Sequence, residues 1–215
     1  SDRATGDLNE YTSKCMTVHI DIDRAEIGKN VSPDISMWGD VKMILQRILD
    51  VLPQCEHPDW LRQIEEYKSA EVLPPAKGFS PRAIIEEVNS RGDADTVVAT
   101  DVGQHQMWTM QFYKFEKPQR LLTSGGLGTM GYGLGAAIGG CIANGRKRTV
   151  LFTGDGSFGM NLNEMATAVS QNLPLTIVVM NNDVLGMVRQ WQTIFYDCHY
   201  SHTTLDRRTD FPALA

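Results

Sequence analysis

The sequence lacks several features that would assign it to a common class. Its 215 residues contain no apolar run near the roughly 18 residues of a membrane span, and the N-terminus has no signal-peptide pattern. The four cysteines have no CxxC spacing, which disfavours a disulfide framework or a zinc site. No basic run offsets the net charge of −6, so we expect no nucleic-acid and no membrane partner. A cytoplasmic protein, or an organelle protein whose targeting segment is absent, is the expectation.

The first third of the sequence looks like the end of a domain. Residues 16–22 are apolar and β-branched and predict a strand that ends at the carboxylates Asp21 and Asp23. These acids either form a ribose-binding edge or cap a turn. Apolar residues at helical spacing predict an amphipathic helix over residues 39–52, packed on that strand. Prolines around a charged segment then predict an interdomain linker over residues 53–78, in which residues 60–70 can form a short helix.

The rest of the chain reads as an α/β domain over residues 79–215. Ser80 followed by Pro81 is typical of a helix start. Alternating strands and helices predict a doubly wound parallel sheet. The predicted strands are residues 96–100, 120–124, 149–153 and 175–180, and residues 101–108 are predicted to form a polar loop. The predicted helices include residues 130–141 and a segment that begins at Ser157. The apolar face of that segment consists of Leu162, Met165, Ala166 and Val169.

Eight glycines fall within residues 125–140. The first three, at positions 125, 126 and 128, permit positive φ and close approach of the main chain to a ligand. The later ones lie in the predicted helix, where each costs about 1 kcal/mol relative to alanine unless the helix packs tightly. Gly126, Gly128 and Gly131 have GxGxxG spacing. This spacing is weak evidence for dinucleotide binding, because the acid expected about 20 residues on is replaced by the basic run 146–148.

Two polar clusters follow successive predicted strands. Gly154-Asp155-Gly156 follows one strand and Asn181-Asn182 follows the next, so both should lie at the same edge of the sheet. The carboxylate of Asp155 and the amide oxygen of Asn182 are ligands that Mg²⁺ prefers. The N-terminus of the helix after Ser157 can bind a diphosphate. Each motif alone is more often a turn or a strand cap, but together they favour a metal-bound phosphate site.

Two other signals remain open on the residues alone. His105 could donate to a phosphate oxygen, although a lone histidine in a loop is more often structural. Met187, Trp191 and Phe195 recur at helical spacing, which is more often a core or interface stripe than a substrate pocket.

Together these motifs closely resemble the catalytic subunit of the acetolactate (acetohydroxyacid) synthase family of thiamine-diphosphate-dependent enzymes. Gly154-Asp155-Gly156, then 24 intervening residues, then Asn181-Asn182 matches the cofactor motif of that class. Further similar segments are residues 103–108, 123–135, 186–192 and 200–203. The resemblance covers essentially the whole chain. It implies a C-terminal fragment: residues 1–52 as the tail of a Rossmann-like FAD-binding central domain, 53–78 as a linker, and 79–215 as a thiamine-diphosphate domain truncated at its C-terminus.

The resemblance also implies a role for each site residue. Asp155 and Asn182 would hold Mg²⁺ by their side chains and Val184 by its carbonyl. Met130 would force the cofactor into its bent form, and Met187 and Trp191 would line the acceptor pocket. Asp2 and Asp21 match acids that touch FAD. Residues implied to contact thiamine diphosphate are Gln104, His105, Gly128, Met130, Gly154, Asp155, Gly156, Ser157, Asn182 and Met187.

The implied reaction is the decarboxylation of pyruvate and its carboligation to a second 2-keto acid, pyruvate or 2-ketobutyrate, in branched-chain amino-acid biosynthesis. A homodimer or homotetramer that can bind a regulatory small subunit is implied, in the bacterial cytoplasm or in a plastid or mitochondrion. The family's catalytic glutamate lies in an N-terminal domain that this sequence lacks, so we expect no turnover from this chain alone. Alternatives are another thiamine-diphosphate enzyme (a pyruvate oxidase, glyoxylate carboligase or 2-keto acid decarboxylase) or a non-catalytic binding module.

Overall fold

The computed structural model of the chain describes residues 5–70, 76, 78–206 and 209–214. Contacts between residues divide the chain into two units, residues 1–73 and 74–215. The division falls inside the predicted linker 53–78. Half of that linker is a helix of 13 residues, α4 (Pro58–Ala70), so its charged segment is helical rather than extended.

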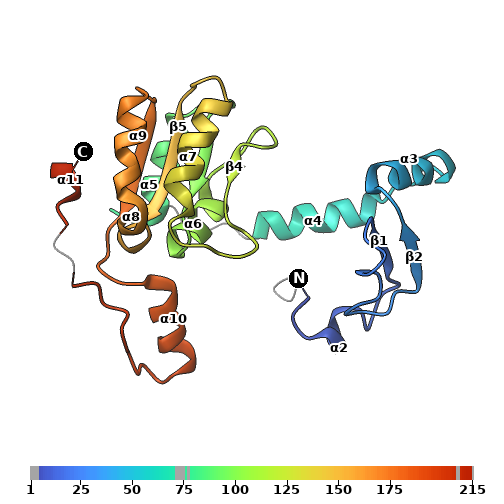
Figure 1. Ribbon diagram of the computed structural model, residues 1–215. Helices are drawn as coiled ribbons and strands as arrows, with labels where there is room; N and C mark the ends of the chain where they lie inside the picture. Colours follow the sequence, from blue (N-terminus) through green and yellow to red (C-terminus); the bar gives the residue numbers. More distant parts are fainter. Residues whose placement is uncertain (1–4, 71–75, 77, 207–208, 215) are drawn as a thin grey trace. The chain divides into compact units, whose positions relative to one another are not determined.

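The first unit contains a pair of parallel strands (Figure 1). Strand β1 (Val18–Asp21) pairs with β2 (Ile35–Trp38), which the sequence analysis did not predict. Helix α2 spans Leu8–Tyr11, and α3 spans Val41–Val51, within the helix predicted over residues 39–52. Asp40 starts α3, since its Oδ1 accepts the N–H of Met43 at 3.1 Å.

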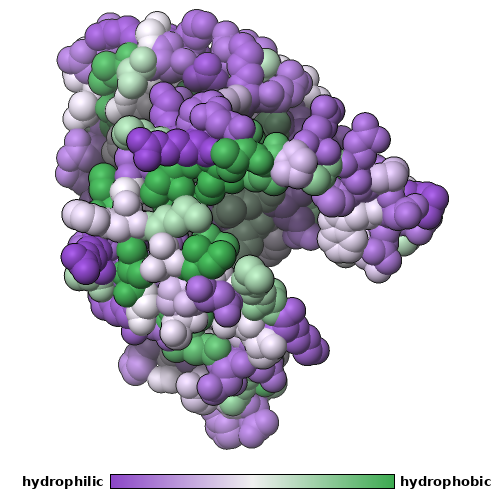
Figure 2. All heavy atoms as spheres, turned by 90° about the vertical axis from the view of Figure 1, so that its right-hand side faces the viewer, coloured by the Kyte–Doolittle hydropathy of each residue, from purple (hydrophilic) through white to green (hydrophobic). Residues whose placement is uncertain are grey.

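The apolar residues of this first unit stay exposed. None of the described residues between 5 and 70 is buried. Val41, Leu45 and Leu49 of α3 are exposed, whereas Ile44 and Ile48 are half-buried, so only part of the apolar face that was predicted to pack is covered. Two strands form too small a sheet to cover a helix face. Figure 2 shows hydrophobic residues, in green, at the surface among hydrophilic ones.

A four-stranded sheet, parallel throughout, is the centre of the second unit. Its strand order is β4-β3-β5-β6. Val98 lies opposite Val150, and Val150 lies opposite Thr176. The strands are β3 (Val97–Thr100), β4 (Leu121–Leu122), β5 (Thr149–Gly154) and β6 (Leu175–Met180), which confirms the four predicted strands, β6 to the residue.

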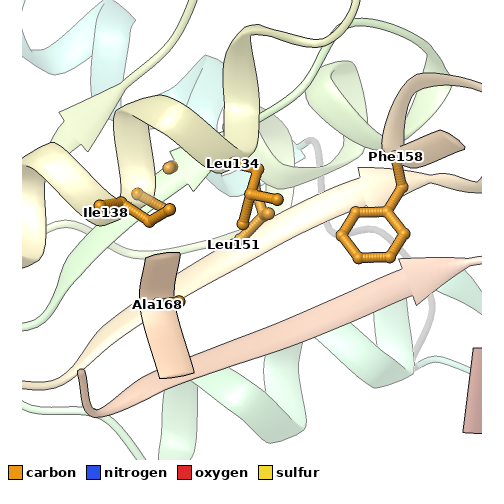
Figure 3. Packing of buried hydrophobic residues seen from close by; sticks show 7 residues of the cluster. Leu134, Ile138, Leu151, Phe158 and Ala168 are labelled. Carbon is orange, nitrogen blue, oxygen red and sulfur yellow. The ribbon is translucent and has the colours of Figure 1, made fainter. Parts of the chain in front are cut away.

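Helices cover both faces of this sheet. On one face, Leu151 of β5 packs against Leu134 and Ile138 of α7 (Figure 3). On the other, Phe152 of β5 packs in a cluster with Ile85 of α5. Successive strand residues point to opposite faces, so the two clusters confirm the doubly wound α/β fold. The helices of this unit are α5 (Pro81–Ser90), α6 (Gln104–Phe112), α7 (Tyr132–Ala143), α8 (Asp155–Asn161), the 3-10 turn η1 (Leu162–Glu164), α9 (Met165–Ser170), α10 (Gly186–Phe195) and α11 (Phe211–Leu214).

Helix starts were predicted with mixed success. Ser80 is the N-cap of α5, as predicted, and its Oγ accepts the N–H of Ala83 at 3.3 Å. The loop predicted over residues 101–108 is wrong, because α6 begins at Gln104. Its N-cap is Gly103, whose φ of 154° turns the chain without a capping side chain, so the start carries no capping signal.

The helix predicted from Ser157 differs in two ways. It begins two residues earlier, at Asp155, and it divides into α8, η1 and α9. The division rotates the apolar face, so that Ala168 is buried and Val169, predicted to be inward, is exposed. Within the described residues no helix combines the length and the apolar character that crossing a membrane requires.

Because the core of the second unit lies on both faces of its sheet, two leucine truncations there should differ greatly in how much they lower the free energy of unfolding. Leu151→Ala removes a side chain that is 0% exposed and should lower the free energy of unfolding by about 2–5 kcal/mol. Leu127→Ala removes the same atoms at a residue that is 85% exposed and should change it by less than about 0.5 kcal/mol. Urea unfolding followed by far-UV circular dichroism measures both. Equal losses would contradict the assigned core.

Candidate functional site

A cavity of about 160 Å³ lies where β3, β5 and β6 end. The chain leaves β3 outward to β4 and then returns through α7, past β3, to β5. The connections that follow β3 and β5 therefore diverge, and ligands of open α/β sheets bind at such a switch point. The topology alone puts the polar clusters predicted after β5 and β6 beside the segment that follows β3.

The cavity brings together the residues that the sequence analysis assigned to thiamine diphosphate. All ten of them line it, and Val184 does as well: Gln104, His105, Gly128, Met130, Gly154, Asp155, Gly156, Ser157, Asn182 and Met187. Sequence reasoning did not assign a site role to the apolar lining residues Val102, Leu185 and Val188, because nothing in their type signals a site.

Two predicted site residues lie elsewhere, and a third is outside the described residues. Trp191 is on α10 but does not line the cavity, and it is 59% exposed. Asp21 ends β1 in the first unit, where its Oδ1 accepts the N–H of Asp23 at 2.8 Å. Asp2 lies outside the described residues.

His105 is a buried histidine with an unused ring nitrogen. Its Nε2 has no hydrogen-bond partner among the described residues. Burial lowers the pKa of His105 to about 4, against the opposing charge and main chain of Asp101, so the ring is neutral at pH 7. A buried polar atom without a partner is rare, and here it belongs to a cavity-lining residue. In the tautomer that carries the proton on Nε2, the ring can donate to a phosphate oxygen.

Glycines on both sides make room for this ring. A Cβ at Gly154 would lie 3.0 Å from His105 Nδ1, and a Cβ at Gly103 would lie 2.8 Å from its Cε1. A Cβ at Gly156 would meet Leu185 Cδ2 at 3.0 Å. The glycines of the predicted Gly154-Asp155-Gly156 motif therefore keep this edge of the cavity narrow and free of side chains.

Asp155 is a buried carboxylate beside other polar groups. Burial raises its pKa, and the charge of Asp183 adds to that rise. With its amide nitrogen turned towards the acids, Asn181 lies 3.2 Å from Asp155 Oδ2 and 3.3 Å from Asp183 Oδ1. A carboxylate whose charge is disfavoured by burial is the group that a bound cation would stabilise most.

The loop after β6 is held in place by the segment that follows α10. Val184 forms an antiparallel bridge with Thr204, and the N–H of Leu185 donates to the carbonyl of Thr203 at 2.8 Å. Asn182 Oδ1 accepts the N–H of Val184 at 3.2 Å, which leaves the second lone pair of that oxygen. These contacts fix the loop that carries two of the predicted metal ligands.

The donor set fits Mg²⁺. In the described part of the chain, no group of three or more His, Cys, Asp or Glu side chains could hold a metal. A cation beside Asp155 would therefore also need the amide oxygen of Asn182, a main-chain carbonyl such as that of Val184, and oxygens from phosphate and water. Few protein ligands with phosphate and water is the coordination that Mg²⁺ usually adopts.

The glycine-rich segment before α7 has its sharp turn later than predicted. Gly128 has φ of 71° and Gly131 has φ of 89°, whereas positive φ at Gly125 and Gly126, an expectation of the sequence analysis, is not observed. Within α7, Gly133 has no room for a Cβ, which would lie 2.9 Å from Leu151 Cδ1, as tight packing predicts. Gly135 and Gly139 do not follow the prediction, since a Cβ at either would meet nothing within 4 Å.

Helix α10 carries the residues predicted for the acceptor pocket. Its Gln190 Oε1 accepts from Gln104 Nε2 at 3.0 Å, so α10 is joined to the first turn of α6. Met187 lines the cavity, whereas Trp191 contacts Phe195 edge-on, with ring centroids 5.9 Å apart. Both aromatic rings are exposed, so the reading of this stripe as core is wrong, and an interface or a substrate pocket remains.

Known proteins match this chain along its whole length. The family model "Thiamine pyrophosphate enzyme, C-terminal TPP binding domain" matches residues 101–215, which is more than half of the chain. The chain is 40% identical to the acetolactate synthase isozyme 3 large subunit of Escherichia coli, over 100% of this chain and 39% of that protein. It is 43% identical to acetolactate synthase 3, chloroplastic, of Brassica napus, over 95% of this chain and 33% of that protein.

The chain thus spans between a third and two fifths of the length of these relatives. The matched family region begins at Asp101, the residue that follows β3, and contains every residue that lines the cavity. By this match the chain belongs to the thiamine pyrophosphate enzymes and carries their C-terminal TPP-binding domain.

Proposed function

We propose that this chain supplies the diphosphate- and Mg²⁺-binding half of an acetolactate synthase active site. The observation that carries the proposal is the single cavity at the carboxyl ends of β3, β5 and β6, lined by all ten residues that the resemblance assigns to thiamine diphosphate. Relatives that are named acetolactate synthases and are about 40% identical support the choice of reaction.

Each side of the cavity would have its own task. Asp155, Asn182 and the carbonyl of Val184 would hold Mg²⁺, while His105 and Gln104 would contact the diphosphate. Bound thiamine diphosphate supplies an electron sink for the decarboxylation of a 2-keto acid. Burial of Asp155 and His105 strengthens their interactions with cation and phosphate, because both act in a medium of low dielectric constant.

The remaining roles rest on the resemblance. Met130 would bend the cofactor, and Met187 and Trp191 would face the acceptor, pyruvate or 2-ketobutyrate. Residues 1–52 would belong to an FAD-binding domain, with Asp21 as one flavin contact. A homo-oligomer with a regulatory small subunit fits relatives that are named large subunits, and the bacterial and chloroplastic relatives leave the cytoplasm and the plastid as compartments.

The proposed metal site predicts Mg²⁺-dependent cofactor binding. Calorimetry with thiamine diphosphate should give heat of binding with Mg²⁺ present and none with EDTA. Asp155→Ala should weaken binding by at least roughly tenfold, because it removes the one carboxylate of the proposed ligand set. Asp59→Ala, which removes an equal charge from an exposed ion pair on α4, is the matched control and should bind normally. Binding that is independent of metal, or that survives Asp155→Ala, would favour the non-catalytic module.

The burial of His105 predicts an unusual titration. The folded chain favours the neutral ring, so its pKa of about 4 lies below the ordinary value near 6.5. The contribution of this shift to stability is present above about pH 6.5 and is lost as the pH falls towards 4. Proton NMR of the histidine ring signals measures the midpoint, and His105→Asn identifies the signal. A His105 midpoint near 6.5 would show that the ring is solvated.

The proposed reaction can be tested in a hybrid. We would replace the matching region of the E. coli isozyme 3 large subunit with this chain and analyse the products made from pyruvate. Acetolactate is expected, and acetaldehyde as the main product would favour a decarboxylase. With 2-ketobutyrate added, Trp191→Leu should lower the ratio of acetohydroxybutyrate to acetolactate roughly tenfold, since one methylene discriminates by about that factor. Trp60→Leu, an exposed tryptophan on α4, is the matched control.

A further inference from the structure

A buried aspartate joins three parts of the second unit and is not among the residues assigned to the cofactor. Asp101 follows β3 and is 1% exposed. Its Oδ1 accepts the N–H of Gly131 at 2.8 Å and that of Val102 at 2.9 Å. Its Oδ2 accepts the N–H of Gly133 at 3.3 Å and the hydroxyl of Thr153 at 3.4 Å. One carboxylate thus satisfies donors from the start of α7 and from β5.

Gly131 is held by one hydrogen bond at its N–H and another at its carbonyl. Asp101 accepts from its N–H, and the amide of Asn161, at the end of α8, donates to its carbonyl at 2.6 Å. Gly131 has φ of 89°, and a Cβ there would lie 2.9 Å from Asn161 Nδ2. We call Asp101, Gly131 and Asn161 the Gly131 clamp. The positive φ and the close amide both disfavour a larger residue than glycine at position 131.

Asp101 acts on the peptide bond that Met130 shares with Gly131, and Asn161 acts on the next one, between Gly131 and Tyr132. The N–H that Asp101 accepts belongs to the first of these bonds, so the position of Met130 is fixed directly. Met130 lines the cavity, and its Cε lies 3.8 Å from where a Cβ of Gly156 would be. A shift of the peptide bond would move this side chain relative to the segment that carries Asp155.

We infer that Asp101 and Asn161 are positioning residues, which hold Met130 at the geometry needed by the part of the ligand beyond its diphosphate. This inference rests on the proposed cofactor. In the proposed function, Asp155 and Asn182 hold the metal and His105 contacts the diphosphate. None of these contacts involves Met130, so loosening the clamp should weaken binding of the organic part of the ligand and not that of the diphosphate end.

The test compares two ligands. Calorimetry with Mg²⁺ measures the Kd of thiamine diphosphate and that of inorganic diphosphate for the chain and for Asp101→Asn. The variant keeps the size of the side chain but turns an N–H towards backbone donors, so the Kd of thiamine diphosphate should rise about tenfold. The Kd of inorganic diphosphate should stay the same or fall, because the variant removes a negative charge that acts on His105, the residue proposed to contact the phosphate.

A surface variant covers the case in which Asp101→Asn does not fold. Asn161 is exposed, and Asn161→Ala should raise the Kd of thiamine diphosphate several-fold, with inorganic diphosphate unaffected. Asn163→Ala, two residues away and also exposed, is the matched control and should change neither Kd. Circular dichroism verifies folding of each variant.

The outcomes separate the two proposals. Selective loss of thiamine diphosphate binding supports the positioning role. Equal changes for both ligands, or none in a folded Asn161→Ala, would overturn it while leaving the cofactor site intact. A parent chain that binds neither ligand would overturn the proposed function, and the positioning role with it.

Discussion

The pairing of β5 with β6 is the constraint on which the candidate site depends. The two strands are parallel and in a register that places Gly154 opposite Met180. Asp155 and Asn182, which follow these residues by one and two positions, are therefore delivered to one edge without any long-range recognition between them. The same sheet places β3 beside β5, so that the start of α6 reaches the same point with His105. Backbone hydrogen bonding, and not the site residues, assembles the cavity.

Strands could be predicted from the sequence more accurately than the starts of helices. Buried parallel strands are continuous apolar runs, and the run that became β6 was delimited by Pro174 and by Asn181, so its bounds could be predicted to the residue. The start of α6 could not be, because Gly103 caps it through backbone conformation and leaves no capping side chain to recognise. Strand β2 was missed because its residues lie between segments rich in turn residues.

The site residues likewise divide into those that local sequence could place and those that it could not. Asp155 and Asn182 stand next to strand ends, so local sequence sufficed to place them together. Asp101 stands next to a strand end too, but what distinguishes it is contact with Gly131 and Gly133, about thirty residues away, and no local pattern announces such a contact. Trp191 is the opposite case. Helical spacing suggested a packed stripe, whereas its ring is exposed and α10 contributes no residue to either core cluster.

Several features of the cavity oppose the stability of the unliganded chain. The Nε2 of His105 is buried and has no hydrogen-bond partner in the described part of the chain, and burial disfavours the charge of Asp155. Gly103 and Gly154 leave room for the histidine ring. Each of these costs is removed or offset by a ligand that brings phosphate oxygens to the histidine and a cation to the carboxylate. A ligand that binds only the folded state stabilises it by RT ln(1 + [L]/Kd), so the groups that weaken the empty fold are the ones through which binding and folding are coupled. The two flanking core clusters, which contain none of these groups, are what keep the sheet intact while the cavity is empty.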